Sequence, residues 1–150
     1  MANTFSQIYL HIIFSVKDRE RLIKGSYKTE LYKYIAQTIT NKGQKLIVIN
    51  GTDDHIHLVI SINPDLSCSE LVKSIKISSS KWINEKKFLR TKFQWQEGYG
   101  VFSYSKSQMS SLIAYVNNQE EHHKRKSFRD EYIELLDKFE IEYDEKYVLG

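Results

Sequence analysis

Two histidines one residue apart, His55 and His57, lie in a strand-like run of apolar residues and offer the most suggestive chemistry in this chain. Side chains on a strand alternate between its two faces, so both imidazoles project to one side while Ile56, Leu58 and Ile60 project to the other. Neighbouring imidazoles backed by an apolar layer are a common beginning of a divalent-metal site. A third ligand and a reacting group must then come from elsewhere in the chain.

Tyr115 and Gln119 are spaced i and i+4 on a predicted helix, so their side chains lie together beside its apolar stripe. A helix packed across the sheet would bring both groups to the edge of the histidine pair. A tyrosine hydroxyl is a poor nucleophile at its reference pKa of ~10. It becomes useful when a bound cation neutralises the phosphodiester that it attacks. A half-buried structural tyrosine is the alternative, and spacing alone favours it.

The hydrophobic pattern predicts strands at about 7–16, 45–50, 55–62 and 93–103, and helices at about 26–41, 67–87, 107–123 and 128–139. The resulting β-α-β-β-α-β order predicts an α+β fold of the ferredoxin-like, split βαβ type. The first and third strands are then central, and both core helices cover one face of the antiparallel sheet. His55 and His57 fall on the other, open face, where His11 of the first strand could join them.

Length and composition indicate one globular domain over residues 1–150, with a core at about 5–128 and an acidic, helical tail at 129–150. Cys68 is the only cysteine, which excludes an intramolecular disulfide and indicates a reducing compartment. Neither a long apolar run nor a signal-peptide pattern is evident. We therefore expect a cytoplasmic location and no membrane partner.

The net charge of +3 is unevenly distributed. Residues 129–150 hold three basic and eight acidic residues, so the rest of the chain carries +8 and suits a polyanionic partner. The acidic tail is interpreted as a solvated helix face. Basic residues interleaved with aromatic ones are candidate DNA contacts, although an ordinary solvated helix face explains them equally well: Lys73, Lys76, Lys81, Arg90 and Lys92. His122 and His123 suit a helix terminus, a phosphate contact or a metal ligand.

Five segments, in this order, carry a resemblance to a known family: Tyr9–Ser15, Asp54–Leu58, Leu71–Ser80, Trp95–Gly100 and Tyr115–His123. Together they span about residues 9–128. The chain resembles the single-tyrosine HUH transposases of small bacterial insertion sequences (the insertion-sequence-two-hundred type), which are related to transposases associated with repetitive extragenic palindromes. Each segment alone is weak evidence, whereas the ordered set is specific.

The resemblance implies a mechanism and partners. His55, His57 and Gln119 would hold a divalent metal ion, Mg²⁺ or Mn²⁺, at the scissile phosphate of single-stranded DNA. Tyr115 would attack that phosphate, giving a 5′-phosphotyrosine link and a free 3′-hydroxyl whose return attack joins DNA ends. Such enzymes recognise DNA hairpins and act as homodimers, in which the tyrosine helix often completes the site of the partner.

Two other interpretations of the residues remain open. An open ferredoxin-like sheet is also a platform for nucleic-acid binding without catalysis, although histidines stand here where that platform usually carries aromatic residues. A metal-dependent hydrolase, in which water attacks and Tyr115 is structural, is the second. A covalent protein–DNA adduct would distinguish the transposase from both.

Overall fold

The computed structural model describes residues 4–148 and contains one four-stranded antiparallel sheet. The strand order is β2-β3-β1-β4, so β1 and β3 are the central pair, as predicted for a ferredoxin-like α+β fold. The bounds are β1 Tyr9–Ser15, β2 Lys45–Gly51, β3 His55–Ser61 and β4 Gly100–Tyr104. The β1–β3 register pairs Ile13 with His57 and Ser15 with His55, which fixes the histidines at one end of the sheet.

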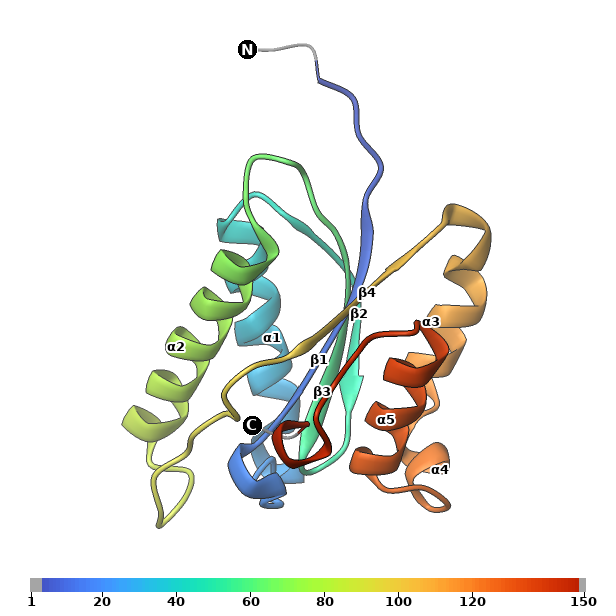
Figure 1. Cartoon of the computed structure of the whole chain (residues 1–150). Helices are drawn as coiled ribbons and strands as arrows, with labels where there is room; N and C mark the ends of the chain where they lie inside the picture. The colour runs from blue at the N-terminus through green and yellow to red at the C-terminus, as the bar shows by residue number, and fades with distance from the viewer. Residues whose placement is uncertain (1–3, 149–150) are drawn as a thin grey trace.

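The helices α1 (Gly25–Asn41) and α2 (Cys68–Lys86) cover one face of the sheet (Figure 1). Both are amphipathic: Leu31, Ile35 and Ile39 of α1 recur at helical spacing and are fully buried. They pack with the sheet residues of the same face, including Ile12 and Phe14. This layer is the main hydrophobic core of the molecule.

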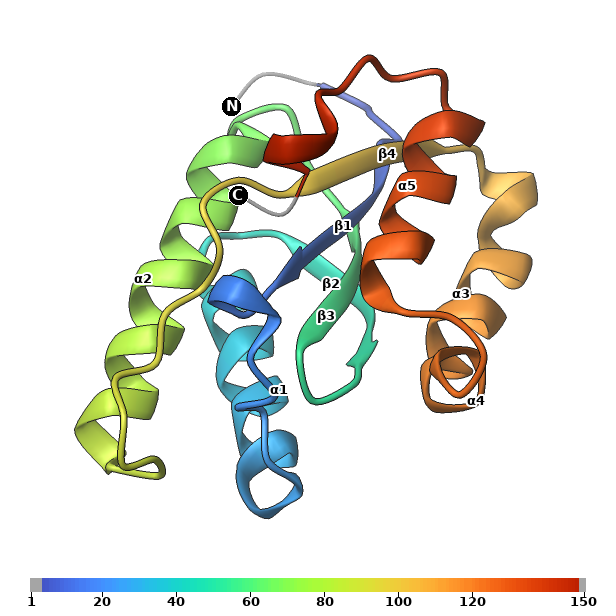
Figure 2. The same ribbon diagram turned by 60° about the horizontal axis from the view of Figure 1, so that its bottom comes forward.

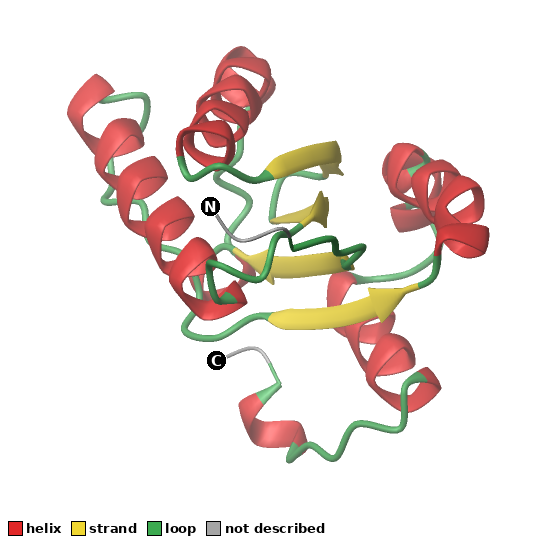
Figure 3. Cartoon of the chain, turned by 90° about the horizontal axis from the view of Figure 1, so that it is seen from above, coloured by secondary structure: helices red, strands yellow, loops and turns green. Residues whose placement is uncertain are grey.

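Three further helices cover the opposite face: α3 (Met109–Asn117), α4 (Gln119–His123) and α5 (Phe128–Lys138). Seen from above, they lie across the sheet from α1 and α2 (Figure 3). The apolar stripe of α3 packs on Val59 of β3, and that of α5 packs on Ile13 and Phe102. This face is therefore covered and not open: the tyrosine-bearing helix lies across it, as predicted, and the apolar stripes of α3 and α5 bury themselves against it.

The fourth strand is shorter than the predicted 93–103. Only Gly100–Tyr104 pairs along β1, while the preceding segment touches the sheet through one isolated bridge between Val16 and Trp95. Gly98 has φ +83°, a left-handed conformation that interrupts an extended strand. The side chain of Trp95 nevertheless packs in the core and donates its indole N–H to the hydroxyl of Ser79 at 2.9 Å.

The predicted helix at 107–123 is divided into two. A short 3-10 turn (Lys106–Gln108) leads into α3, and the backbone N–H of Ser105 at its start donates to the side-chain oxygen of Gln108 at 2.9 Å. Asn118 then leaves the helical region, with φ −100° and ψ 22°, and separates α3 from α4. The helix predicted at 128–139 is confirmed as α5, which Ser127 caps by accepting a hydrogen bond from the backbone N–H of Asp130.

Across the described residues, no helix combines the length and the apolarity needed to cross a membrane.

The hairpin between β2 and β3 sets the position of His55, and Gly51 is its most sterically constrained residue. A Cβ at Gly51 would lie 2.1 Å from the carbonyl oxygen of His55, and backbone cannot yield as a flexible side chain would. We expect Gly51→Ala to lower the free energy of unfolding by about 1–3 kcal/mol, measured by chemical denaturation.

Gly25→Ala is the matched control, because a Cβ there meets nothing within 4 Å at the beginning of α1. It should leave stability unchanged or raise it by up to about 1 kcal/mol. Equal stability of the two variants would contradict the packing of this hairpin.

Candidate metal centre and nucleophile

The sheet supplies three histidines to one cluster. His55 and His57 of β3 are both fully buried on the face beneath α3 and α5. His11 of β1 faces the same side, and its Nε2 lies 2.7 Å from Nδ1 of His57. Alternation along the two central strands places all three rings together, as the sequence pattern predicts.

Tyr115 and Gln119 approach this cluster from the helical layer. The carboxamide oxygen of Gln119 lies 3.1 Å from Nε2 of His55, and the Gln119 side chain is fully buried. The ring of Tyr115 packs edge-on against the ring of His57, with centroids 5.9 Å apart. The structure therefore brings the four predicted site residues together within one chain.

A buried carboxylate, Glu131 of α5, lies at the centre of the cluster and was missed by the sequence analysis. It accepts hydrogen bonds from Nε2 of His57 at 3.2 Å and from Nε2 of His123 at 2.9 Å. It also accepts from the amide of Gln119 at 3.2 Å and from the hydroxyl of Tyr115. The interpretation of the tail as a wholly solvated face is thus wrong at this residue.

One signal in the sequence could have located Glu131. It stands three residues after Phe128 and four before Leu135, inside the apolar stripe that buries α5. An acid within such a stripe is rarely left unpaired, because burying a bare carboxylate is costly. Its partners could not be found in this way, since they lie on β3, α3 and α4.

The charges of the cluster follow from its burial. Burial would raise the pKa of Glu131, but hydrogen bonds from His123 and His57 and the nearby imidazoles hold that pKa well below its usual range, so the carboxylate is ionised. Burial, followed by the charge of Glu131, raises the pKa of Tyr115 far above its ordinary value. The Tyr115 hydroxyl is therefore protonated, and its oxygen could act as a nucleophile only if an acceptor took that proton.

The two stacked histidines are neutral. Burial lowers the pKa of His57 to about 4 and that of His11 well below its ordinary value. Without a cation, neutral rings suit a relay in which Nε2–H of His11 donates to Nδ1 of His57, whose Nε2–H donates to Glu131. In the other tautomer, Nδ1–H of His57 donates to Nε2 of His11, and Nε2 of His57 keeps the lone pair that a metal ion needs. Neutral imidazole is also the form that binds a metal ion.

His55 provides the clearest test of whether a cation fits. Its Nδ1 lies 2.7 Å from the carboxylate of Asp54, whose pKa is lowered against the effect of burial by its hydrogen bond with His55. With Nδ1–H donated there, Nε2 carries a lone pair that faces carboxamide and carboxylate oxygens of Gln119 and Glu131, at 3.1 and 3.5 Å. Converging lone pairs are what a metal ion satisfies.

More ligand atoms are available than the three that the sequence predicts. One donor atom from each of His55, His57, His123 and Glu131 lies within 4.8 Å of every other. Several imidazoles with a carboxylate suit a divalent transition metal better than Mg²⁺, which prefers oxygen ligands. The residues therefore fit a divalent cation, and His123 adds a possible ligand beyond the predicted set.

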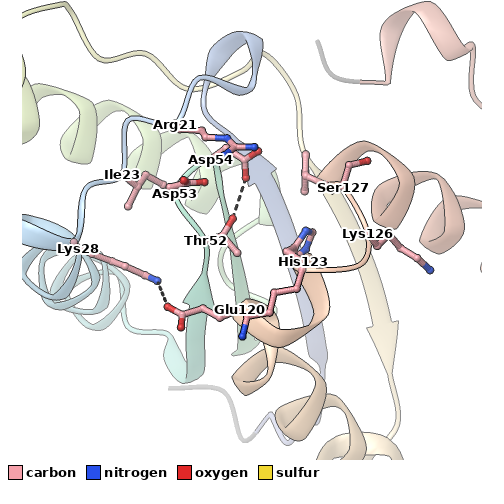
Figure 4. A pocket seen from close by; sticks show the side chains of 13 residues that line it. Arg21, Ile23, Lys28, Thr52, Asp53, Asp54, Glu120, His123, Lys126 and Ser127 are labelled. Carbon is pink, nitrogen blue, oxygen red and sulfur yellow. Dashed lines mark hydrogen bonds and ion pairs between the residues drawn. The ribbon is translucent and has the colours of Figure 1, made fainter.

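A surface cavity of about 470 Å³ adjoins the cluster and is partly lined by His123 (Figure 4). The Lys28–Glu120 ion pair at 3.4 Å closes part of its wall. Asp54, which precedes His55 at the start of β3, also lines the cavity, so both Asp54 and His123 connect it to the buried cluster. Both basic and acidic side chains line its other walls, Arg21, Lys126 and Asp53 among them.

The basic residues singled out in the sequence lie on a different part of the molecule. Lys73, Lys81, Arg90 and Lys92 are exposed on α2 and the segment that follows it, across the sheet from the histidines. Lys76 is half-buried and donates to the carbonyl oxygens of Gln96 and Gly98, so it holds the segment before β4 in place. A role for any of them in DNA contact stays a prediction.

Comparison with known proteins identifies the family. Residues 4–119 match the family model described as "Transposase IS200 like", which is well over half of the chain. The chain belongs to the IS200-like transposase family. It is accordingly a tyrosine transposase, an enzyme that cuts and transfers DNA strands.

Relatives of this transposase agree with the assignment. The ISDra2 transposase TnpA of Deinococcus radiodurans is 23% identical over 118 residues, which cover 75% of this chain and 84% of that protein. A crystal structure of a transposase from Deinococcus radiodurans R1 superposes with a TM-score of 0.65 at 19% identity, covering 79% of this chain and 95% of that one. A REP-associated tyrosine transposase bound to a REP hairpin superposes with a TM-score of 0.63 at 11% identity, covering 82% and 73%.

The family match ends at Gln119, so it includes the two strand histidines, Tyr115 and the glutamine. Glu131 and the whole of α5 lie beyond it. Part of the buried centre of this transposase is therefore built from a segment outside the matched region.

Asp54 orients His55, so its charge should affect metal binding. We expect Asp54→Asn to weaken Mn²⁺ binding by about 10–100-fold in calorimetric titration, because the amide no longer anchors Nδ1–H of His55 as strongly. Asp53→Asn is the matched control, since Asp53 is exposed and its side chain makes no hydrogen bond among the described residues. Equal affinities for the two variants would show that Asp54 does not support a metal ligand.

Proposed function

We propose that this transposase cleaves and rejoins single-stranded DNA through a 5′-phosphotyrosine intermediate on Tyr115. The observation that carries the proposal is the position of the Tyr115 hydroxyl. It donates to Glu131, which in turn holds His57 and Gln119. The nucleophile and the candidate metal ligands thus belong to one hydrogen-bonded cluster.

In the proposed cleavage, the phenolic oxygen of Tyr115 forms a bond to the scissile phosphorus, and the bond from phosphorus to the 3′-oxygen breaks. The phenolic proton passes to the carboxylate of Glu131, which already accepts that hydrogen bond. The departing 3′-oxygen takes a proton from water and becomes a hydroxyl. Glu131, whose lowered pKa makes it a weak base, passes the phenolic proton on to water, so the protons balance. Attack by a 3′-hydroxyl on the phosphotyrosine reverses these steps and joins DNA ends without an external energy source.

We propose His55, His57 and Gln119 as ligands of the divalent ion, Mg²⁺ or Mn²⁺, with His123 and Glu131 also within reach. The several imidazoles favour Mn²⁺. When bound, the ion would neutralise charge on the phosphate. The residues themselves fix its position: Asp54 orients His55, and the pair of His11 with His57 orients the second ring.

The proposed substrate is single-stranded DNA that ends in a hairpin, and the proposed compartment is the cytoplasm. A related transposase has been solved with a REP hairpin, which supports a hairpin here. Lys73, Lys81, Arg90 and Lys92 present exposed positive charge for such DNA. A homodimer is proposed on the family resemblance alone, because one chain already holds Tyr115 beside the histidines.

Tyr115→Phe should abolish the covalent adduct. We would incubate the protein with Mn²⁺ and single-stranded DNA copied from the flanks of its gene, and follow adducts on a denaturing gel. The variant lacks the attacking oxygen but keeps the ring that packs on His57. His57→Ala should reduce the adduct by about 100-fold or more, because it removes a metal ligand.

Tyr147→Phe is the matched control: Tyr147 is largely exposed, remote in sequence from the cluster, and should give adduct at the wild-type rate. An adduct that survives Tyr115→Phe would show that another residue is the nucleophile. Cleavage without an adduct in the wild-type protein would favour a hydrolase, and binding without cleavage would favour a binding module.

Light scattering after size-exclusion chromatography tests the proposed dimer. We expect twice the mass of the chain. Mixing Tyr115→Phe with His57→Ala protein then tests exchange of the tyrosine helix, because a site shared between partners would regain adduct formation. A monomeric mass would contradict the dimer and would leave the site complete within one chain.

A further inference from the structure

A groove between α3 and α5 begins at the proposed nucleophile and has no role in the function described so far. Its volume is about 380 Å³, at the lower end of the range of roughly 300–1,000 Å³ typical of small-molecule sites. The two helices lie side by side in two views of the molecule (Figures 1 and 2). Tyr115 lines the groove from α3, and Leu135 and Lys138 line it from α5.

The helical spacing explains how this groove is connected to the buried centre. Ser111 lies one turn before Tyr115 on α3, so both face the groove. On α5, Leu135 and Lys138 follow Glu131 at i+4 and i+7, on the same helix face. The groove is thus lined by Tyr115, whose hydroxyl donates to Glu131, and Lys138 follows Glu131 by ~10.5 Å along the axis of α5.

The chemistry of its walls suits one nucleotide. Tyr104 contributes a half-buried aromatic ring for stacking, and Leu112 and Leu135 contribute apolar surface. Gln108 uses its carboxamide oxygen to cap the turn at Ser105, which leaves its NH₂ group to donate to a base. Lys138 is the only charged side chain among the lining residues described, and it can meet a phosphate.

We infer that this groove holds the first nucleotide of the DNA strand that becomes attached to Tyr115. The inference rests on the proposed function, because the 5′-phosphotyrosine link tethers that nucleotide to the Tyr115 oxygen. In an in-line displacement the departing 3′-strand leaves on the side opposite the nucleophile. The attached strand is therefore the one that remains beside Tyr115, with its base between Tyr104 and Leu135 and its next phosphate near Lys138.

The test compares intact DNA with DNA in which the first nucleotide after the cut is abasic. The probe is the gene-flank strand that yields the Tyr115 adduct. For wild-type protein we expect the DNA concentration that gives half-maximal adduct to be about tenfold higher with the abasic strand than with the intact strand, because stacking of that base is lost. Ser111→Trp, which fills the groove, should show the same loss with intact DNA and no further loss with abasic DNA.

Ser110→Trp is the matched control, since Ser110 is the exposed neighbour that does not line the groove. It should behave as wild type. A second readout needs no catalysis: in Tyr115→Phe protein, fluorescence anisotropy should show weaker binding of the 5′-phosphorylated product strand when Lys138 is changed to Ala.

The outcomes separate this inference from the proposed function. If wild-type protein forms adduct equally well with intact and abasic DNA, or if Ser111→Trp matches Ser110→Trp, the groove does not hold this nucleotide and the phosphotyrosine mechanism stands. If no strand gives an adduct, the mechanism fails and the inference fails with it.

Discussion

Burial of one carboxylate is the interaction on which this centre depends. Glu131 is withdrawn from water, and an ionised carboxylate in such a place is stable only with several donors. Its donors come from β3, α3 and α4, so the requirement to satisfy one charge fixes three elements relative to α5. Loss of a partner from a buried charge typically costs about 3–5 kcal/mol, far more than an exposed ion pair contributes.

The sheet makes this arrangement possible because its two faces are used differently. One face carries a mainly apolar core against α1 and α2, which supplies stability without constraining the site. The other face places His11, His55 and His57 on neighbouring central strands, where register rather than loop conformation sets their separation. The apolar stripes of α3 and α5 flank the polar cluster and exclude water from it. Low local polarity then strengthens each hydrogen bond within the cluster.

The parts of the molecule set by local periodicity were predictable from the sequence. The strand order, the shared face of His55 and His57, and the proximity of His11 all follow from alternation and a familiar topology. The assignment of Tyr115 as a site residue needed the resemblance to the family as well, since spacing alone favoured a structural role for this tyrosine. The role of Glu131 and the break at Asn118 were not predictable, because they depend on contacts between residues remote in sequence. The predicted fourth strand was too long. Its first part contains Phe93 and Trp95, which are apolar and buried but do not belong to a continuous ladder of strand hydrogen bonds.

The position of α5 after the family-matched region has a consequence for biosynthesis. A ribosome completes both strand histidines, Tyr115 and Gln119 before it makes Glu131. Until α5 emerges, the tyrosine lacks the carboxylate that accepts its hydrogen bond, and the groove beside it lacks one wall. A nascent or truncated chain would therefore display every residue of the family-matched region without a finished reaction centre. Synthesis of α5 is therefore the step that completes the buried cluster.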